Sequence, residues 1–190
     1  MSKLWFRYSA MGAGKSIHLL QVANNYESNS KRVALFTALI DNRSGEAGVI
    51  ESRLGVKRRA ETFDVDTVFD ARLVGPSVSC ILVDEAQFLT PDQVRQLHRL
   101  VHDLGVPAIC YGLRSDFRGE PFPGSAMLLT CADAIEELRR TCACDRKATM
   151  NMRLDAAGNR VREGEQVQVG GDESYRAVCP SCFYLEWEAE

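Results

Sequence analysis

The chain has 190 residues and a formal net charge of -3, with hydrophobic residues at 45% and charged residues at 26% of its composition. This composition is typical of a globular protein with one core and a small satellite, and the acidic balance argues against nucleic acid as a partner. No apolar run approaches the roughly 20 residues of a membrane-spanning helix, and Arg7 interrupts the N-terminal apolar run, so we expect a cytoplasmic protein without a membrane partner.

A strand, a glycine-rich turn and a helix are predicted at the start of the chain. The aromatic-rich run 4–8 has the character of a strand, and the apolar residues from Ile17 to Val22 fit a helix. Between them stand Ser9, Ala10, Met11, Gly12, Ala13, Gly14, Lys15 and Ser16. This segment matches the P-loop pattern G-x-x-x-x-G-K-[ST], except that Ser9 replaces the first glycine.

The residue types of this turn suit the binding of ATP and magnesium. Backbone N–H groups at a helix N-terminus can surround phosphates, the Lys15 ammonium can neutralise the β- and γ-phosphate oxygens, and the Ser16 hydroxyl can reach Mg²⁺. The alternative is a chance Gly-Lys-Ser at an ordinary helix start. The strand before the turn, the helix after it and an acidic pair further along the chain favour the nucleotide site.

Three more short apolar runs follow, at 32–37, 80–83 and 107–111, and runs of this kind are typical of buried parallel strands. A helix is predicted between the last two, beginning at Thr90-Pro91-Asp92 and ending before Gly105. Such a crossover helix indicates an α/β fold with a doubly wound parallel sheet.

Asp84 and Glu85 directly follow the strand at 80–83. A carboxylate at the C-terminal end of a buried strand can bind magnesium directly or through water, although Asp84 could instead cap the next turn. Glu85, beside the metal, can accept a proton from whatever attacks the γ-phosphate. The pair by itself leaves open whether the attacking group is water or a substrate hydroxyl.

The pattern changes after about residue 140, and we predict two parts: a P-loop nucleotide-binding domain at 1–140 and a small β-rich, zinc-ribbon-like lobe at 141–190. A hairpin is expected around 155–158. The lobe contains Cys142, Cys144, Cys179 and Cys182, two close pairs that can present four thiolates to zinc. With four sulfur ligands the zinc should be structural, because no position stays open for substrate. The alternative is four unrelated thiols, as we expect for the three single cysteines at 80, 110 and 131.

Taken together, four motifs closely resemble the thymidine kinases of the zinc-containing cellular type, in their bacterial form. These are the P-loop, the segment 83–88, the segment 111–119, and the four cysteines with Gly170, Gly171 and Tyr175 between them. The resemblance covers nearly the whole chain. It implies transfer of the γ-phosphate of ATP to the 5′-hydroxyl of thymidine, and a homotetramer that thymidine triphosphate inhibits.

The resemblance also implies roles for individual residues. Glu85 is expected to be the catalytic base, with Lys15 and Arg43 as the other catalytic residues. Asp41, Ala86 and Gln87 join the P-loop and Asp84 in binding ATP and magnesium; from sequence alone, Asp41 and Arg43 would only be part of a polar loop.

A nucleoside pocket follows from the same resemblance. Its expected residues are Met11, Phe88, Leu113, Phe117, Phe122, Asn151, Val169, Gly170, Gly171 and Tyr175. The paired glycines would let the backbone of a lid loop approach the base closely, whereas without the resemblance they suggest a turn between strands. The three phenylalanines could equally belong to the core.

Two other function classes fit parts of the sequence. A P-loop ATPase with a zinc ribbon could act on nucleic acid, but the chain shows no basic track for a strand. A non-catalytic zinc module could sense nucleotides, but sensing does not require a general base such as Glu85.

Overall fold

The computed structural model describes residues 2–41, 47–167 and 174–188. At its centre is a six-stranded sheet in the order β5-β2-β6-β7-β1-β8, in which every neighbouring pair is parallel. Its strands are β1 (Leu4–Tyr8), β2 (Arg32–Ala38), β5 (Glu61–Phe63), β6 (Val78–Val83), β7 (Ala108–Gly112) and β8 (Ala134–Glu137). The predicted parallel α/β sheet is confirmed.

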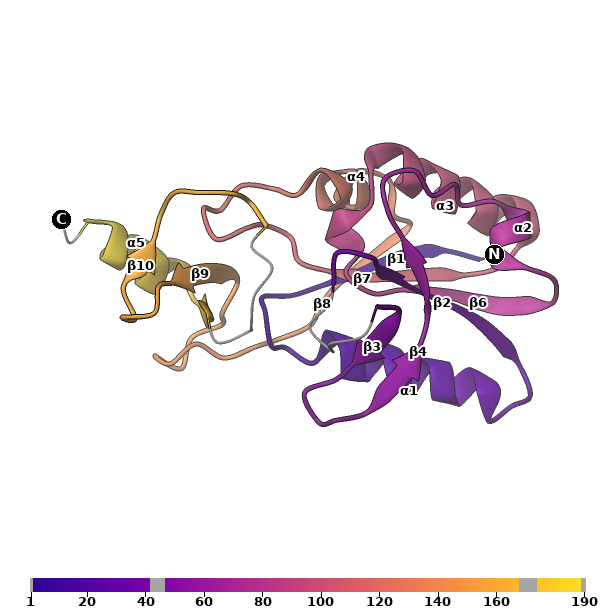
Figure 1. Cartoon of the computed structure of the whole chain (residues 1–190), viewed down its shortest axis with the longest axis horizontal. Helices are drawn as coiled ribbons and strands as arrows, with labels where there is room; N and C mark the ends of the chain where they lie inside the picture. Colours follow the sequence, from indigo (N-terminus) through magenta and orange to yellow (C-terminus); the bar gives the residue numbers. More distant parts are fainter. Residues whose placement is uncertain (1, 42–46, 168–173, 189–190) are drawn as a thin grey trace.

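Helices cover both faces of this sheet, with α1 (Lys15–Glu27) on one side and α3 (Pro91–Leu104) and α4 (Pro123–Cys131) on the other (Figure 1). Successive residues of one strand therefore enter different cores. In β6, Ile81 and Val83 pack in the α3 and α4 core, whereas Cys80 and Leu82 pack in the α1 core. This two-sided burial explains why the strands are continuously apolar.

The crossover helix α3 has both of its predicted ends. Thr90 and Gln93 form a capping box, Pro91 occupies the first turn, and Gly105 ends the helix with a φ of 66°. These local signals set both ends of the helix that connects the parallel strands β6 and β7.

Four of the six sheet strands are predicted from the sequence, and β5 and β8 are not. Both are short and largely exposed, so they lack the continuous apolar run that marks the others. The antiparallel hairpin of β3 (Val49–Glu51) and β4 (Lys57–Arg59) was likewise not predicted. A one-turn helix α2 (Ala71–Val74) and a 3₁₀ turn η1 (Ala86–Phe88) complete this part.

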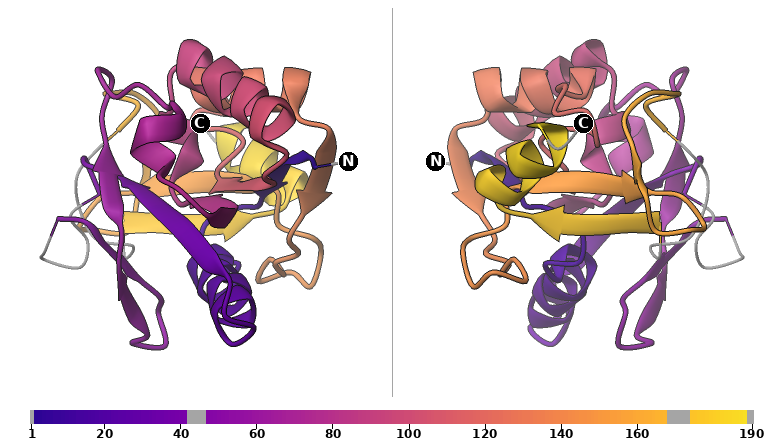
Figure 2. Two further views of the ribbon diagram at one scale, coloured as in Figure 1. Left: turned by 90° about the vertical axis from the view of Figure 1, so that its right-hand side faces the viewer. Right: turned by 90° about the vertical axis from the view of Figure 1, so that its left-hand side faces the viewer.

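The C-terminal segment forms a separate three-stranded antiparallel sheet, at the other end of the molecule (Figures 1 and 2). It consists of β9 (Met150–Leu154), β10 (Arg160–Val161) and β11 (Tyr175–Val178), followed by α5 (Pro180–Glu188). The hairpin predicted around 155–158 is present between β9 and β10. The lobe has its own small core, to which Ala10 of the P-loop also belongs. That the two parts are distinct domains with a boundary near residue 141 stays a prediction.

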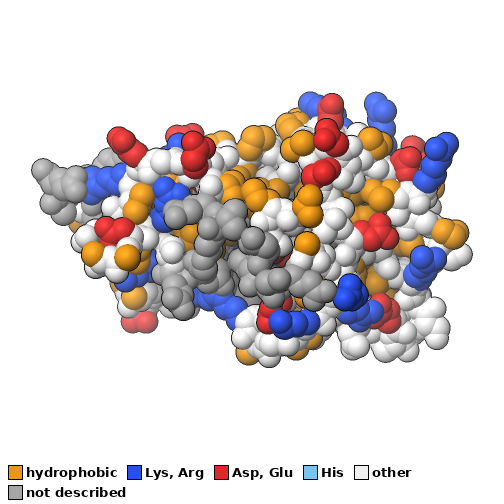
Figure 3. All heavy atoms as spheres, in the orientation of Figure 1, with side chains coloured by type: hydrophobic (Ala, Val, Ile, Leu, Met, Phe, Trp, Pro, Cys, Tyr) orange, Lys and Arg blue, Asp and Glu red, His pale blue; other side chains and the backbone are white. Residues whose placement is uncertain are grey.

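None of the helices in the described ranges is long and apolar enough to cross a membrane. On the face shown in Figure 3, acidic and basic side chains are interspersed and do not gather into one basic track.

Candidate active site

The P-loop connects the end of β1 to the start of α1, so its N–H groups lie at a helix N-terminus. Gly12 and Gly14 have φ angles of 70° and 81°, which favour glycine. Ser9 is not among the residues with a positive φ, so serine is accommodated where the pattern has glycine. The Lys15 ammonium lies across the loop, 3.3 Å from Ser9 Oγ and 3.4 Å from the carbonyl oxygen of Ala10.

The predicted magnesium residues meet in the structure. Asp84 directly follows β6, is 2% exposed, and accepts a 2.9 Å hydrogen bond from the Ser16 hydroxyl. Its backbone N–H donates to the carbonyl oxygen of Phe36 at 2.8 Å, which anchors the turn to β2. A hydroxyl and a carboxylate side by side at a phosphate-binding loop are a suitable donor set for Mg²⁺.

Glu85 is buried next to this pair, and its conformation is unusual. Its φ of 51° and ψ of 39° place a non-glycine residue in the left-handed region, which is strained and uncommon. The Gln87 amide donates to the Glu85 carboxylate, while Gln87 Oε1 accepts the Leu113 N–H at 3.0 Å. Gln87 thereby fixes the Glu85 side chain relative to the end of β7.

Gly112 is required by this arrangement. A Cβ atom at residue 112 would lie 2.9 Å from Gln87 Oε1 and 3.0 Å from the Gln87 backbone nitrogen. The last residue of β7 therefore has to be glycine for Gln87 to hold both partners.

Two neighbouring cavities open at the P-loop. The first, of about 310 Å³, is lined by Met11, Lys15, Ser16, Glu85 and Leu113 among others, and the second, of about 410 Å³, by residues that include Met11, Arg140 and Tyr175. Arg53 lines both. Three of the expected nucleoside residues, Met11, Leu113 and Tyr175, thus border the space beside the phosphate loop.

Asn151 joins the lobe to the P-loop. It is 3% exposed, accepts a 2.8 Å hydrogen bond from the Met11 N–H, and donates to the carbonyl oxygen of Ser115 at 3.2 Å. The Asn151 amide therefore fixes the position of the Met11 backbone. Its effect on the pocket is indirect, because Met11 lines the cavity.

The three expected aromatic residues lie in packed surroundings. Phe117 and Phe122 are 1% and 5% exposed, and the Arg153 guanidinium lies 3.8 Å from the Phe117 ring centroid. Phe88 is partly buried and meets Phe122 edge-on with a centroid distance of 6.0 Å. The structure thus pairs Phe88, at the end of η1, with Phe122, at the start of α4. The contact of the three phenylalanines with a nucleoside base stays a prediction.

Several predicted residues have no structural description here. Arg43, Val169, Gly170 and Gly171 lie outside the described residues. Asp41 follows β2, and its N–H donates to the carbonyl oxygen of Ala38 at 2.9 Å. Asp84 follows the neighbouring parallel strand β6, so Asp41 and Asp84 lie at the same edge of the sheet, and a role of Asp41 in binding ATP stays a prediction.

Two arginines at the P-loop were not identified from the sequence. Arg140 donates to the carbonyl oxygen of Gly12, and Arg53 comes from the turn between β3 and β4. A Cβ atom at residue 12 would lie 2.4 Å from Arg140 Nη1 and 2.5 Å from Arg53 Nη1. No local pattern marks either residue, because their approach depends on the position of an unpredicted hairpin and of the link to the lobe.

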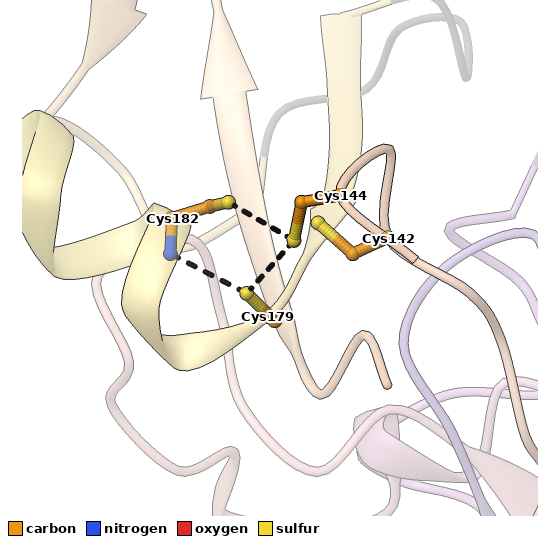
Figure 4. Close-up of side chains that lie close together, drawn as sticks. All are labelled: Cys142, Cys144, Cys179 and Cys182. Carbon is orange, nitrogen blue, oxygen red and sulfur yellow. Dashed lines mark hydrogen bonds between the residues drawn. The ribbon is translucent and has the colours of Figure 1, made fainter. Parts of the chain in front are cut away.

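The four predicted cysteines converge (Figure 4), with their sulfur atoms all within 4.8 Å of one another. Cys144 Sγ lies 3.5 Å from the sulfurs of both Cys179 and Cys182. Tetrahedral zinc with Zn–S bonds of about 2.3 Å requires S···S distances of about 3.8 Å, so this donor set fits zinc after a small expansion.

Hydrogen bonds within the cluster shift the pKa values of these thiols in opposite directions. Backbone N–H groups of Cys144 and Cys179 lower the pKa of Cys142 to about 6, which favours its thiolate. Hydrogen bonding with the neighbouring sulfurs raises the pKa of Cys182 to about 12, because one cluster without a cation does not favour four negative charges. A bound divalent cation would offset the repulsion among four thiolates and so favour the ionised form of all four cysteines.

A parallel α/β sheet with a P-loop, a hydroxyl–carboxylate pair and an adjacent buried glutamate defines a nucleotide-binding protein of the phosphoryl-transfer class. The family model described as "Thymidine kinase" matches residues 2–183, so the chain belongs to the thymidine kinase family. Relatives named "Thymidine kinase" include one from Chromobacterium violaceum, 56% identical over 97% of this chain and 99% of the relative. Others come from Albidiferax ferrireducens, at 58% over 100% and 96%, and Ruegeria pomeroyi, at 51% over 94% and 92%.

Proposed function

We propose that this chain transfers the γ-phosphate of ATP to the 5′-hydroxyl of thymidine, yielding ADP and thymidine monophosphate. The observation that carries the proposal is the buried Glu85 held beside the Ser16–Asp84 pair at the P-loop. Membership of the thymidine kinase family and relatives named for this activity support the choice of nucleoside.

The proposed transfer gives each group at the P-loop one task. The P-loop N–H groups and Lys15 bind the phosphates, and Ser16 and Asp84 would hold a magnesium ion, which would neutralise negative charge on the phosphates. Glu85 accepts the proton of the 5′-hydroxyl, whose oxygen forms a bond to the γ-phosphorus as the bond to the ADP oxygen breaks. A substrate hydroxyl, rather than water, is thus the expected attacking group.

The nucleoside is proposed to occupy the space bordered by Met11, Leu113 and Tyr175. Asn151 positions Met11 from the lobe, which ties the shape of this pocket to the zinc-bearing segment. We further propose that the loop containing Val169, Gly170 and Gly171 covers the base, and that Arg43 stabilises the transferred phosphoryl group; both rest on the resemblance.

The four cysteines are proposed to hold one structural zinc ion per chain. The resemblance also supports a homotetramer inhibited by thymidine triphosphate. A cytoplasmic location is supported by the seven cysteines, none of which forms a disulfide.

The function is tested by incubating purified protein with ATP, magnesium and a panel of nucleosides. Thymidine should give its 5′-monophosphate, with deoxyuridine as the nearest competitor and purine nucleosides unreactive. A different result would favour the alternative function of an ATPase that acts on nucleic acid. In that case no nucleoside would be phosphorylated, and single-stranded nucleic acid would stimulate ATP hydrolysis.

Arg53 is expected to be a further phosphate-binding residue, because its guanidinium lies at Gly12 and lines the phosphate cavity. Arg53→Ala should lower kcat/KM for ATP about 10–100-fold, as for the loss of a charged hydrogen bond. Steady-state kinetics with varied ATP measure this effect. Arg58→Ala is the matched control, since Arg58 belongs to the same hairpin but pairs with Glu27 of α1. Equal kinetics for the two variants would exclude Arg53 from the site.

A further inference from the structure

Two histidines and an aspartate meet at the end of the sheet opposite the P-loop. His98 and His102 are one turn apart on α3, and Asp133 lies between α4 and β8. Their ligand atoms all lie within 4.8 Å of one another. Leu4, whose N–H donates to Asp133 Oδ2 at 2.8 Å, is the first residue of β1, whereas the P-loop follows the last. The cluster is therefore separate from the nucleotide site.

The distances within this cluster fit a tetrahedral metal ion. The two Nε2 atoms are 3.2 Å apart, Asp133 Oδ2 lies 3.4 Å from His102 Nε2, and Asp133 Oδ1 lies 3.8 Å from His98 Nε2. Zinc bonds of about 2.0–2.2 Å to nitrogen and oxygen require ligand atoms about 3.4 Å apart. To bind such an ion, the two Nε2 atoms would have to separate and Asp133 and His98 would have to approach, each by a few tenths of an ångström.

The surroundings orient all three ligands. Residues four apart on a helix share one face, so α3 presents both imidazoles in the same direction. The Leu4 N–H holds the Asp133 carboxylate, as outer hydrogen bonds do for metal-binding carboxylates.

We propose that His98, His102 and Asp133 bind one divalent transition-metal ion, such as zinc, in a site additional to the four-cysteine cluster. Two imidazoles and one carboxylate favour zinc, nickel or copper over magnesium or calcium. Three protein ligands at the surface leave a fourth position for water, so the ion should exchange. Because α3 and the residue just before β8 supply the ligands, the bound ion would link this helix to the edge strand of the sheet and stabilise the fold.

The test is calorimetric titration of the full, tag-free chain with zinc chloride, after loading its cysteine cluster with one equivalent and removing the excess. Wild-type protein should bind one further zinc, and zinc should raise its Tm. His98→Ala and His102→Ala should weaken this second binding at least about 10-fold and abolish the zinc-dependent rise in Tm. His18→Gln, which removes the remaining histidine of the chain, is the matched control and should bind as wild type does.

Unchanged thymidine phosphorylation by His98→Ala without added zinc will show that this variant is folded. Wild-type protein that takes up no zinc beyond the cysteine cluster would overturn the proposal. Equal second binding by wild type and His98→Ala would overturn it as well, because the zinc would then lie elsewhere on the surface.

Discussion

Replacement of Glu85 by Gln is expected to lower kcat for thymidine phosphorylation about 10²–10⁴-fold, as for the loss of a general base. The amide keeps the size of the side chain but cannot accept the hydroxyl proton. ATP binding should change little, because Ser16, Asp84 and Lys15 stay in place. Single-turnover phosphorylation and separate ATP-binding measurements distinguish these two effects.

Glu51 provides the matched control for this experiment. It is a second carboxylate that lines the same cavity, but it pairs with Lys57 at 3.0 Å in the β3–β4 hairpin. Glu51→Gln should retain most of its turnover. Near-normal turnover in Glu85→Gln, or an equal loss in Glu51→Gln, would remove Glu85 from the proposed role of base.

Cys179→Ser is expected to remove the structural zinc and destabilise the C-terminal lobe. Cys179 is 1% exposed, contacts Cys144 across the cluster, and belongs to the small core of the lobe. Structural zinc contributes about 10–16 kcal/mol of apparent binding free energy in zinc-finger peptides, and a lobe of this size has little other core to replace it. Elemental analysis and thermal unfolding measure the two losses.

Cys131→Ser serves as the control, because Cys131 ends α4 and lies outside the cluster. It should keep one zinc per chain at the cysteine cluster and unfold close to wild type. A Cys179→Ser protein with full zinc content and an unchanged Tm would contradict the structural role. The Cys179→Ser substitution should lower the Tm more than it lowers the rate of phosphoryl transfer, although Asn151 and Ala10 connect the lobe to the P-loop.

The sequence determined the features that are encoded locally. The P-loop, the acidic pair after β6, the capping signals of α3 and the spacing of the four cysteines each depend on residues close together in the chain. Continuous apolar runs identified four parallel strands, because burial on both faces leaves no polar alternation. Those features were sufficient to predict which residues bind ATP, magnesium and zinc.

Only the tertiary structure decided which distant residues meet. Arg53 and Arg140 reach Gly12, Asn151 reaches Met11, and Asp133, just before β8, meets the two histidines of α3. These contacts depend on strand order and on the placement of a short hairpin and a separate lobe. No local sequence pattern marks these contacts, because residues about 30 to 140 positions apart are brought together by the packing of whole elements rather than by any local preference.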